Sequence, residues 1–407
     1  MVVVRFAPAP SGPLHLGNIR TALFNWLFAR KHGGRFVLRL DNTDALRCHP
    51  ADEKTIQEDL LWLGLSWNDF MRQSDMCYAD TIDTLKKTGR LYPCYESTEE
   101  LKAFREQCSA QGRPPVYRRK GHDQTEKKGQ TAHWRFALEE KEVPWEDMMR
   151  GSVSYHTKHL SDPILLRENG EMSYMLSSVA DDIRLQISHI IRGEDHVTNT
   201  AIQIQLFEAL SAACPLFGHF PLLQDTQGKK LSKRLKAMSV KELRDQGILP
   251  MAVLNVLISL GSGKAPPVDQ SLDDSARTFS LTDYGRAPPC LDRQQIVQTN
   301  QALLKALSYQ QMCQESSSPY PSPELWDVIR DNITFLKEIT FWMHVCAGSL
   351  TTSARKEDHS LLAVALKYLP LPPWGPDSWQ GWMRAIQDNS PYQGKSLYHP
   401  LRFALTG

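Results

Sequence analysis

The residues near the N-terminus that are best suited to chemistry stand in the segment APAPSGPLHLG, Ala7–Gly17. His15 can donate a hydrogen bond to a phosphate oxygen, and Gly17 would let a phosphate or a ring approach the backbone closely. Asn18 can cap a helix with regularly spaced apolar residues, and the N–H groups and dipole at a helix N-terminus attract phosphate. The segment indicates a nucleotide site. The plainer alternative is a strand, loop and helix with an incidental histidine.

Two short apolar runs flank this segment and predict strands at Val2–Ala7 and Arg35–Leu40. The second run ends at Asp41–Asp44, which places acidic groups at the same sheet edge as the proline-rich loop. Amphipathic patterns predict helices over Asp52–Leu65 and Asp80–Gly89. This alternation favours an α/β fold with a parallel, doubly wound sheet, in which nucleotides bind beyond the carboxyl ends of the strands.

Between about Leu91 and Pro163 the pattern changes, and we expect an insertion between two halves of the nucleotide-binding domain. Short strands are predicted at His133–Leu138 and Val153–His156. The insertion also carries a basic run made up of Arg118, Arg119, Lys120, Lys127 and Lys128. This run is either a solvated loop or part of an RNA-binding surface.

The second half of the nucleotide-binding domain resumes at Ser161–Arg192, where a strand and turn precede the apolar strand LQISHIIR. We predict a helix over Thr198–Ser211 and a strand over His219–Leu223, which leads into the lysine-rich turn Lys230–Arg234. Beyond it the chain becomes helical, with apolar stripes at Val240–Gly247 and Pro250–Gly261, a linker at Gly263–Arg277 and mixed helical patterning from Leu281 onward.

Composition bounds the class of protein. The 407 residues, of which 41% are hydrophobic, are enough for roughly two to four domains with sizeable cores. Because 47 basic and 46 acidic residues leave a net charge of only +1, a nucleic-acid surface must come from local clustering. We expect no membrane span and no signal peptide. The eight cysteines contain no CxxC pair, which favours a reducing compartment and disfavours a zinc knuckle.

The segment His15-Leu16-Gly17-Asn18 resembles the HIGH motif of class I aminoacyl-tRNA synthetases, and Lys230-Leu231-Ser232-Lys233-Arg234 resembles their KMSKS loop. Val2–Asp44 as a whole is similar to glutamyl-tRNA synthetases of the shorter bacterial type. The resemblance implies a Rossmann-like catalytic domain at 1–90 and 161–235, with an inserted α/β acceptor-end-binding domain at 91–160. It further implies a helical stem-contact region at 236–280 and an all-α anticodon-binding domain at 281–407.

Such an enzyme joins an amino-acid carboxylate to the α-phosphate of ATP, and pyrophosphate leaves. Since no covalent enzyme intermediate is needed, catalysis consists of positioning and electrostatic stabilisation. The resemblance makes His15, Lys230 and Lys233 catalytic, with Lys233 as the main cation on the triphosphate. A lysine-rich turn by itself is usually just solvated. The implied ATP-binding residues are Pro8, His15, Gly17, Asn18, Glu194, Lys230, Leu231, Ser232, Lys233 and Arg234.

The turn that contains Glu194 has a second interpretation. In the family this region lines the nucleotide and ribose side of the site. The alternative is that Glu194 or Asp195 caps the following helix, since acidic groups are favourable at a helix N-terminus.

The amino-acid pocket that the resemblance implies consists of Arg5, Ala7, Ala9, Asp41, Tyr174, Ser178 and Arg192. Arg5 would bind the substrate's side-chain carboxylate in bidentate fashion, and Arg192 is the second pocket arginine. Asp41 stands where the family has an acid for the substrate ammonium. Two arginines and one acid suit a ligand with two carboxylates and one amine, which is glutamate. Either arginine alone would more simply form a surface ion pair.

Four positions depart from the family pattern. Ala9 lacks a hydroxyl that commonly touches the substrate, Asp41 is one methylene shorter than the usual glutamate, Asn42 loses a charge, and Ser178 replaces a common asparagine. One lost hydrogen bond costs about 0.5–1.5 kcal/mol, so each change would weaken glutamate binding by up to roughly tenfold. Since both arginines remain, we keep glutamate as the expected substrate.

We therefore expect a cytoplasmic monomer that ligates glutamate to tRNA(Glu) with ATP and Mg²⁺. We expect no zinc, because Cys94 is followed by Tyr95 and Glu96 with no second thiol nearby. One alternative is a paralogue that glutamylates a modified tRNA base, which the long segment beyond Leu281 disfavours. The other is a non-catalytic RNA-binding or regulatory paralogue, which the intact HIGH-like and KMSKS-like segments disfavour.

Overall fold

The computed structural model describes residues 1–44, 46–119, 131–229, 239–264, 266–268, 270–316, 320–348, 355–375 and 377–406. The chain divides into two compact units, Met1–Ala306 and Leu307–Gly407. The predicted loop Lys230–Arg234 and three lysines of the basic run, Lys120, Lys127 and Lys128, lie outside the described residues. What they do therefore stays a prediction.

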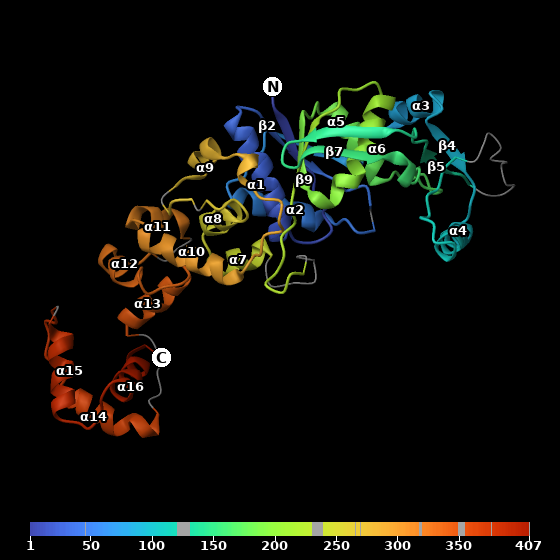
Figure 1. Ribbon diagram of the computed structural model, residues 1–407. Coiled ribbons are helices and arrows are strands. Elements are labelled where there is room, and N and C mark those ends of the chain that lie inside the picture. The colour runs from blue at the N-terminus through green and yellow to red at the C-terminus, as the bar shows by residue number, and fades with distance from the viewer. Residues whose placement is uncertain are drawn as a thin grey trace. The chain divides into compact units, whose positions relative to one another are not determined.

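A parallel three-stranded sheet begins the first unit (Figure 1). Its order is β1 (Val3–Phe6), β2 (Arg35–Leu40) and β3 (Asp69–Arg72). Helices α1 (Leu16–Lys31) and α2 (Pro50–Trp62) connect these strands, as parallel pairing requires. Both predicted strands are present. The predicted helix over Asp52–Leu65 begins two residues earlier, because Pro50 suits the first helical position.

A four-stranded sheet continues on the other side of β1. Its order is β7 (Gly151–His156), β6 (Glu142–Asp147), β10 (Leu216–Phe220) and β9 (His189–Gly193). The β6–β7 pair is antiparallel and the other pairs are parallel. The N–H of Ser188, just before β9, donates to the carbonyl of Val3 at 2.9 Å, so β9 lies beside β1. The strand order reverses between β1 and β9, which confirms the predicted doubly wound fold.

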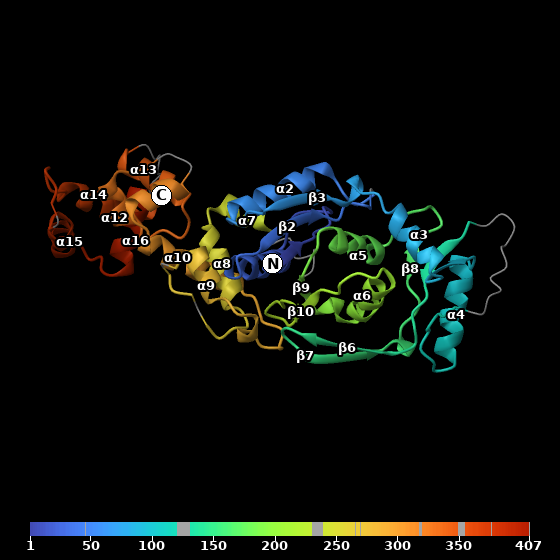
Figure 2. The same cartoon turned by 90° about the horizontal axis from the view of Figure 1, so that it is seen from above.

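Residues 91–160 contribute to two different sheets. The strands β4 (Leu91–Cys94) and β5 (His133–Phe136) form an antiparallel sheet with β8 (Ile164–Leu166). Nearby helices are α3 (Ala79–Lys87) and α4 (Thr98–Ala110). Both strands predicted in this region are present, but β7 pairs with β6, and β6 pairs with β10 of the main sheet. Figure 2 shows this hairpin alongside α6 (Val197–Ala209), against which it packs.

The main core of the first unit lies where α5 (Tyr174–Arg184) and α6 cover the strands. Its most buried side chains include Leu176, Val179, Ile190, Leu206 and Phe217. The strand predicted over His219–Leu223 lies three residues earlier, as β10, because Pro221 has no backbone N–H to continue the ladder. None of the eight cysteines, all of which are described, forms a disulfide.

Helices complete both units. Those of the first are α7 (Val240–Gln246), α8 (Pro250–Ser259), α9 (Leu272–Thr278) and α10 (Arg293–Ala306). The linker predicted over Gly263–Arg277 is partly wrong, because Ser271 caps α9 by accepting a hydrogen bond from the N–H of Asp274 at 3.1 Å. The second unit holds α11 (Tyr309–Glu315), α12 (Pro323–Ile329), α13 (Glu338–Cys346), α14 (His359–Lys367), α15 (Ser378–Asp388) and α16 (Lys395–Thr406). Within the described ranges, no helix is both long enough and apolar enough to cross a bilayer.

Candidate active site

Helix α1 begins within the predicted nucleotide segment, one turn earlier than expected. Its N-cap is His15 and not Asn18, which is a correction to the sequence interpretation. His15 Nδ1 accepts a hydrogen bond from the backbone N–H of Asn18, and Asn18 Oδ1 accepts one from the backbone N–H of His15, both at 3.3 Å. This reciprocal capping box holds the imidazole at the start of the helix.

Gly17 stands against the ring of His15. A Cβ atom at this position would lie 2.9 Å from His15 Cε1 and 3.0 Å from His15 Nδ1, which is closer than such atoms approach. A larger residue would therefore displace the ring. Glycine here makes room for the histidine that caps the helix, in addition to any room it makes for a ligand.

A cavity of about 410 Å³ opens at the carboxyl ends of β1 and β9. Eight of the predicted site residues line it: Arg5, Ala7, Pro8, His15, Gly17, Asn18, Tyr174 and Arg192. The rest of the lining is Phe6, Arg20, Thr21, Gly193, Asp195, His196, Phe220, Leu222 and Leu223, of which the sequence interpretation singled out only the turn that contains Asp195 and His196. The cavity thus joins most of the predicted amino-acid pocket to the predicted nucleotide segment, at the switch point of the sheet.

Two buried arginines face this cavity from neighbouring strands. Arg5 on β1 and Arg192 on β9 are each 4% exposed. Arg5 Nε donates to Asp182 Oδ1 at 3.1 Å, and Arg39 Nη1 donates to the same oxygen at 2.8 Å. Burial, with the nearby charge of Arg5, lowers the pKa of Arg192 to about 10. The Arg192 guanidinium is therefore still charged at neutral pH and favours an anionic ligand.

The guanidinium of Arg192 is held along one edge. Its Nε donates to His219 Nε2 at 3.1 Å, and its Nη2 donates to Thr200 Oγ1 at 2.8 Å and to Gln203 Oε1 at 2.6 Å. Its Nη1 is buried and has no hydrogen-bond partner within the described part of the chain. Because an unpaired buried donor is costly, this atom is where a ligand carboxylate would bind most favourably.

Tyr174 and His196 line the same cavity, with their ring centroids 5.8 Å apart. Burial, followed by the charge of Arg192, lowers the pKa of His196 to about 4. The imidazole is therefore neutral at pH 7. It adds an aromatic, uncharged wall, and the arginines supply the positive charge.

The remaining predicted amino-acid residues lie elsewhere. Asp41 and Ala9 line a second cavity, of about 250 Å³, which shares Tyr174 with the first. Arg39 holds the Asp41 carboxylate through Nε at 2.7 Å and Nη2 at 3.2 Å. Ser178 is fully buried and lines neither cavity, and its hydroxyl accepts a hydrogen bond from Gln203 Nε2 at 3.3 Å.

Residues 1–273 match the family of class I tRNA synthetases (E and Q), catalytic domain. The chain belongs to this family. It is 44% identical over 417 residues to glutamate–tRNA ligase 1 of Rhodospirillum rubrum and 42% identical over 419 residues to glutamate–tRNA ligase of Azospirillum brasilense. Each alignment covers 100% of this chain and 93% of the relative. The predicted family and enzyme class, an aminoacyl-tRNA ligase, are confirmed.

A solved structure supports the same fold for this synthetase. The crystal structure of a glutamate tRNA ligase from Elizabethkingia meningosepticum CCUG26117, in complex with its amino acid, matches with a TM-score of 0.77 at 25% sequence identity. The match covers 99% of this chain and 93% of that one.

In the charged turn after β9, Asp195 and His196 line the cavity and Glu194 does not. Glu194 accepts a hydrogen bond from Arg150 Nη1 at 2.9 Å and from the N–H of Leu222 at 3.3 Å, and it does not line the cavity of this synthetase. Neither Glu194 nor Asp195 caps a helix in the described structure, so the capping alternative is wrong. Asp195 and His196 do line the cavity, and their position next to Arg192 in the chain was the signal for them.

The segment downstream of the KMSKS-like loop reaches the HIGH-like segment. Ser239 forms an antiparallel bridge with His15, and the N–H of Val240 donates to the carbonyl of Leu14 at 3.2 Å. Ser239 also caps α7 by accepting a hydrogen bond from the N–H of Glu242 at 3.2 Å. The downstream flank of the lysine loop is therefore fixed at the start of α1.

Part of the basic run is packed into the synthetase's insertion. Arg118 Nη1 donates to Asp162 Oδ1 at 3.0 Å, and Arg119 Nη1 donates to the carbonyl of Gly89 at 3.3 Å. Arg118 is therefore a structural residue, and the solvated-loop interpretation does not hold for it.

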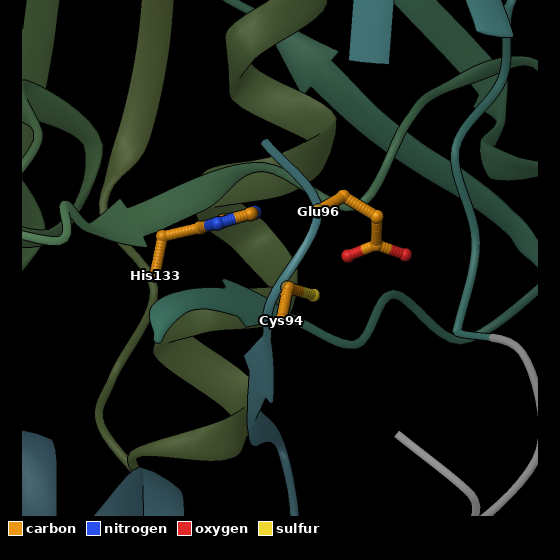
Figure 3. A group of neighbouring side chains, drawn as sticks. All are labelled: Cys94, Glu96 and His133. Carbon is orange, nitrogen blue, oxygen red and sulfur yellow. The ribbon is translucent and has the colours of Figure 1, made fainter. Parts of the chain in front are cut away.

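Three side chains of metal-binding type meet in the insertion, Cys94, Glu96 and His133 (Figure 3). Their ligand atoms all lie within 4.8 Å of one another. The Tyr117 hydroxyl donates to Glu96 Oε1 at 2.6 Å, while Arg135 Nε donates to His133 Nε2 at 3.2 Å. The arginine places a permanent positive charge against the group and occupies one nitrogen of its histidine, which opposes a bound cation. Glu96 Oε2 is buried without a described partner, so metal content is worth measuring.

Proposed function

We propose that this synthetase ligates glutamate to tRNA(Glu) through a glutamyl-adenylate, with ATP as the energy source. The observation that carries the proposal is the unpaired Nη1 of Arg192, a residue that lines one cavity together with Arg5 and His15. Two cationic groups fit a dicarboxylate better than an uncharged amide side chain. The names of the relatives, which are glutamate–tRNA ligases, support the same substrate.

In this proposal Arg5 and Arg192 bind carboxylate groups of glutamate, and Ala7 and Tyr174 complete the walls of the pocket. Asp41 binds the substrate ammonium, although it has to do so while paired with Arg39 in the adjoining cavity. Ala9 lies beside Asp41, and Ser178 acts from behind by orienting Gln203 against Arg192.

ATP lies at the start of α1 in this proposal, against Pro8, His15, Gly17 and Asn18. The charge that develops on the phosphoryl oxygens is stabilised by His15 and by Lys230 and Lys233 of the loop Lys230–Arg234, which follows from the sequence. Glu194 contributes indirectly by holding Arg150. Among the described residues that line the cavity, Asp195 supplies the carboxylate. Mg²⁺ would enter bound to ATP, and because it keeps waters and phosphate oxygens as ligands, it needs few protein ligands.

The tRNA contacts follow the predicted division of the chain. We propose that residues 91–160 bind the acceptor end, residues 236–280 contact the stem, and the helices of 281–407 read the anticodon. We also propose that the enzyme acts as a cytoplasmic monomer. Sedimentation with and without tRNA tests the stoichiometry, and a dimer would contradict it.

The first experiment is ATP–pyrophosphate exchange with glutamate, run with and without tRNA(Glu). Exchange that requires tRNA supports the proposal and shows that the altered pocket accepts glutamate. Retained tRNA binding without exchange would point to another amino acid or to a non-catalytic paralogue. The variant Lys233→Ala is the matched control, because it should lose most exchange while keeping its melting temperature.

The base-modifying paralogue is disfavoured by a described feature. The second unit has its own buried helical core, formed by α14, α15 and α16, as expected for a synthetase that carries a C-terminal helical domain. Charging of a transcript that lacks modified bases separates the two activities, since only the ligase would accept it.

A further inference from the structure

His219 and Arg192 are cross-strand neighbours in the main sheet. They stand opposite one another in the register of β10 and β9, so their side chains leave the same face of the sheet. His219 is 1% exposed. Its Nε2 accepts the hydrogen bond from Arg192 Nε at 3.1 Å, and Thr200 Oγ1 lies 3.1 Å from the same nitrogen.

The other ring nitrogen of His219 faces Asp147 at the end of β6. The distance from His219 Nδ1 to Asp147 Oδ2 is 2.5 Å. The second oxygen, Oδ1, accepts three backbone N–H groups, from Met149 at 3.0 Å, Arg150 at 3.1 Å and His219 at 3.1 Å. The carboxylate is thus fixed in place, and it requires a proton on Nδ1 of the ring.

We propose that Asp147 and His219 are positioning residues that orient Arg192 for the substrate carboxylate. With its proton on Nδ1, the imidazole offers Nε2 as an acceptor to Arg192 Nε. Thr200 and Gln203 hold Nη2, so the guanidinium has one orientation, and Nη1 is the atom left over for the ligand. The inference rests on the proposed function. It adds Asp147 of the insertion, and His219 of the second half of the nucleotide-binding domain, to the residues that support the glutamate pocket.

Two variants of His219 separate positioning from packing. In His219→Gln the amide oxygen can reach the position of Nε2 and accept from Arg192. In His219→Asn the shorter amide can still donate to Asp147 but cannot reach Arg192. We expect His219→Asn to raise the KM for glutamate by about 10- to 100-fold, the effect of one hydrogen bond to a charged group, and His219→Gln to restore most of it. The KM for ATP should stay within about twofold in both variants.

The Asp147→Asn variant tests the proton position directly. Because three N–H groups surround Oδ1, the amide oxygen will take that place and the amide nitrogen will face His219 Nδ1. The ring proton is then forced onto Nε2, where it opposes the N–H of Arg192 Nε. We expect the KM for glutamate to rise as in His219→Asn, and the ¹⁵N spectrum of labelled histidine to report the exchanged tautomer at His219.

The matched control is His133→Asn. It removes an arginine–histidine contact of the same kind, from Arg135, in the separate sheet formed by β4, β5 and β8. At saturating tRNA it should leave the KM for glutamate unchanged. Equal effects of Asn and Gln at position 219, or a rise in KM for ATP as large as that for glutamate, would overturn the inference. A wild-type enzyme that does not activate glutamate would instead overturn the proposed function, whereas the tautomer measurement would still test the Asp147–His219 contact.

Discussion

The Arg192–His219 pair of the main sheet and the Arg135–His133 pair of the insertion share one contact. In each, an arginine Nε donates to a histidine Nε2, at 3.1 Å and 3.2 Å respectively. In the insertion, Arg135 Nη1 also donates to the carbonyl of Asp162 at 2.7 Å, and its guanidinium lies 4.0 Å from the centre of the Tyr117 ring. In the main sheet, Arg192 Nη1 is buried and has no described partner, and the Arg192 side chain lines a cavity.

The difference lies in what remains of each guanidinium after the shared contact. Arg135 has no buried nitrogen without a partner among the described residues, so it acts as a structural clamp. Arg192 is buried to a similar extent, but its Nη1 has no described partner and its side chain lines the cavity. The unpaired donor and the adjoining cavity together make Arg192, and not Arg135, the candidate binding residue of the two.

The comparison is tested most strongly by Arg192→Lys. Lysine has no planar fork and leaves His219 or Gln203 without a donor, so kcat/KM for glutamate should fall by about 100-fold or more. The measurement is tRNA-dependent ATP–pyrophosphate exchange. The matched Arg135→Lys variant should keep its exchange rate within about twofold at saturating tRNA. A similar loss in both variants would show that the leftover donor has no special role.

The same Arg135→Lys variant should instead lose stability. It breaks the hydrogen bonds to His133 and to the carbonyl of Asp162 and removes the stacking on Tyr117. We expect a decrease in the free energy of unfolding of about 1–3 kcal/mol, measured by urea denaturation. Wild-type stability would mean that the insertion does not depend on this clamp.

Asp59 is the contrasting case of a buried charged residue. Its carboxylate oxygens have no described hydrogen-bond partner, but the residue does not line the active-site cavity. This α2 residue is fully buried, neither carboxylate oxygen has a described hydrogen-bond partner, and Arg244 Nη1 lies 3.6 Å away. Burial raises the pKa of Asp59 to about 6, and Arg244 opposes the shift only in part. Since the folded pKa lies above the unfolded one, stability should fall as the pH rises from about 4 through about 6.

The variant Asp59→Asn removes this titration. It should be more stable than the wild type by about 2–3 kcal/mol at pH 8, with most of the difference lost near pH 4, and its activity should be unchanged. Denaturation curves at the two pH values measure it. A difference that is independent of pH would contradict an ionised, uncompensated carboxylate.

The smallest expected effect concerns zinc in the insertion. Because Arg135 occupies one nitrogen of His133 and Tyr117 donates to Glu96, we predict no stoichiometric zinc in the purified protein by elemental analysis. Added zinc should then leave the melting temperature unchanged, since a ligand that does not bind the folded state cannot stabilise it. One zinc per chain would mean that Arg135 turns away, and the clamp would lose its role.

Much of the fold follows from local sequence pattern. The strands β1 and β2 and the helices α2 and α6 stand close to the residues that predicted them, because their apolar periodicity and their turn residues agree. The pairing of β6 with β10 could not be predicted in this way. It joins residues about seventy positions apart, and nothing in either segment specifies the partner.

The candidate active site also has a part that local sequence predicts and a part that it does not. Arg5, His15, Tyr174 and Arg192 stand in recognisable segments, and the structure brings them to one cavity. The partners of those residues do not stand in such segments. His219 and Asp147 owe their position to strand register and to a distant hairpin, so their contact with Arg192 is visible only in three dimensions.

The β6–β7 hairpin also limits how synthetases of this kind can be recombined. Replacing residues 91–160 with the corresponding segment of another synthetase would remove β6 and Asp147, which accepts the hydrogen bond from His219. A shorter graft ending before Glu142 would transfer β4, α4 and β5 and leave the main sheet its own strands. For chimaera design, the exchangeable module therefore ends where β6 begins, and the acceptor-end contacts that we propose for it could be exchanged without removing Asp147 from the main sheet.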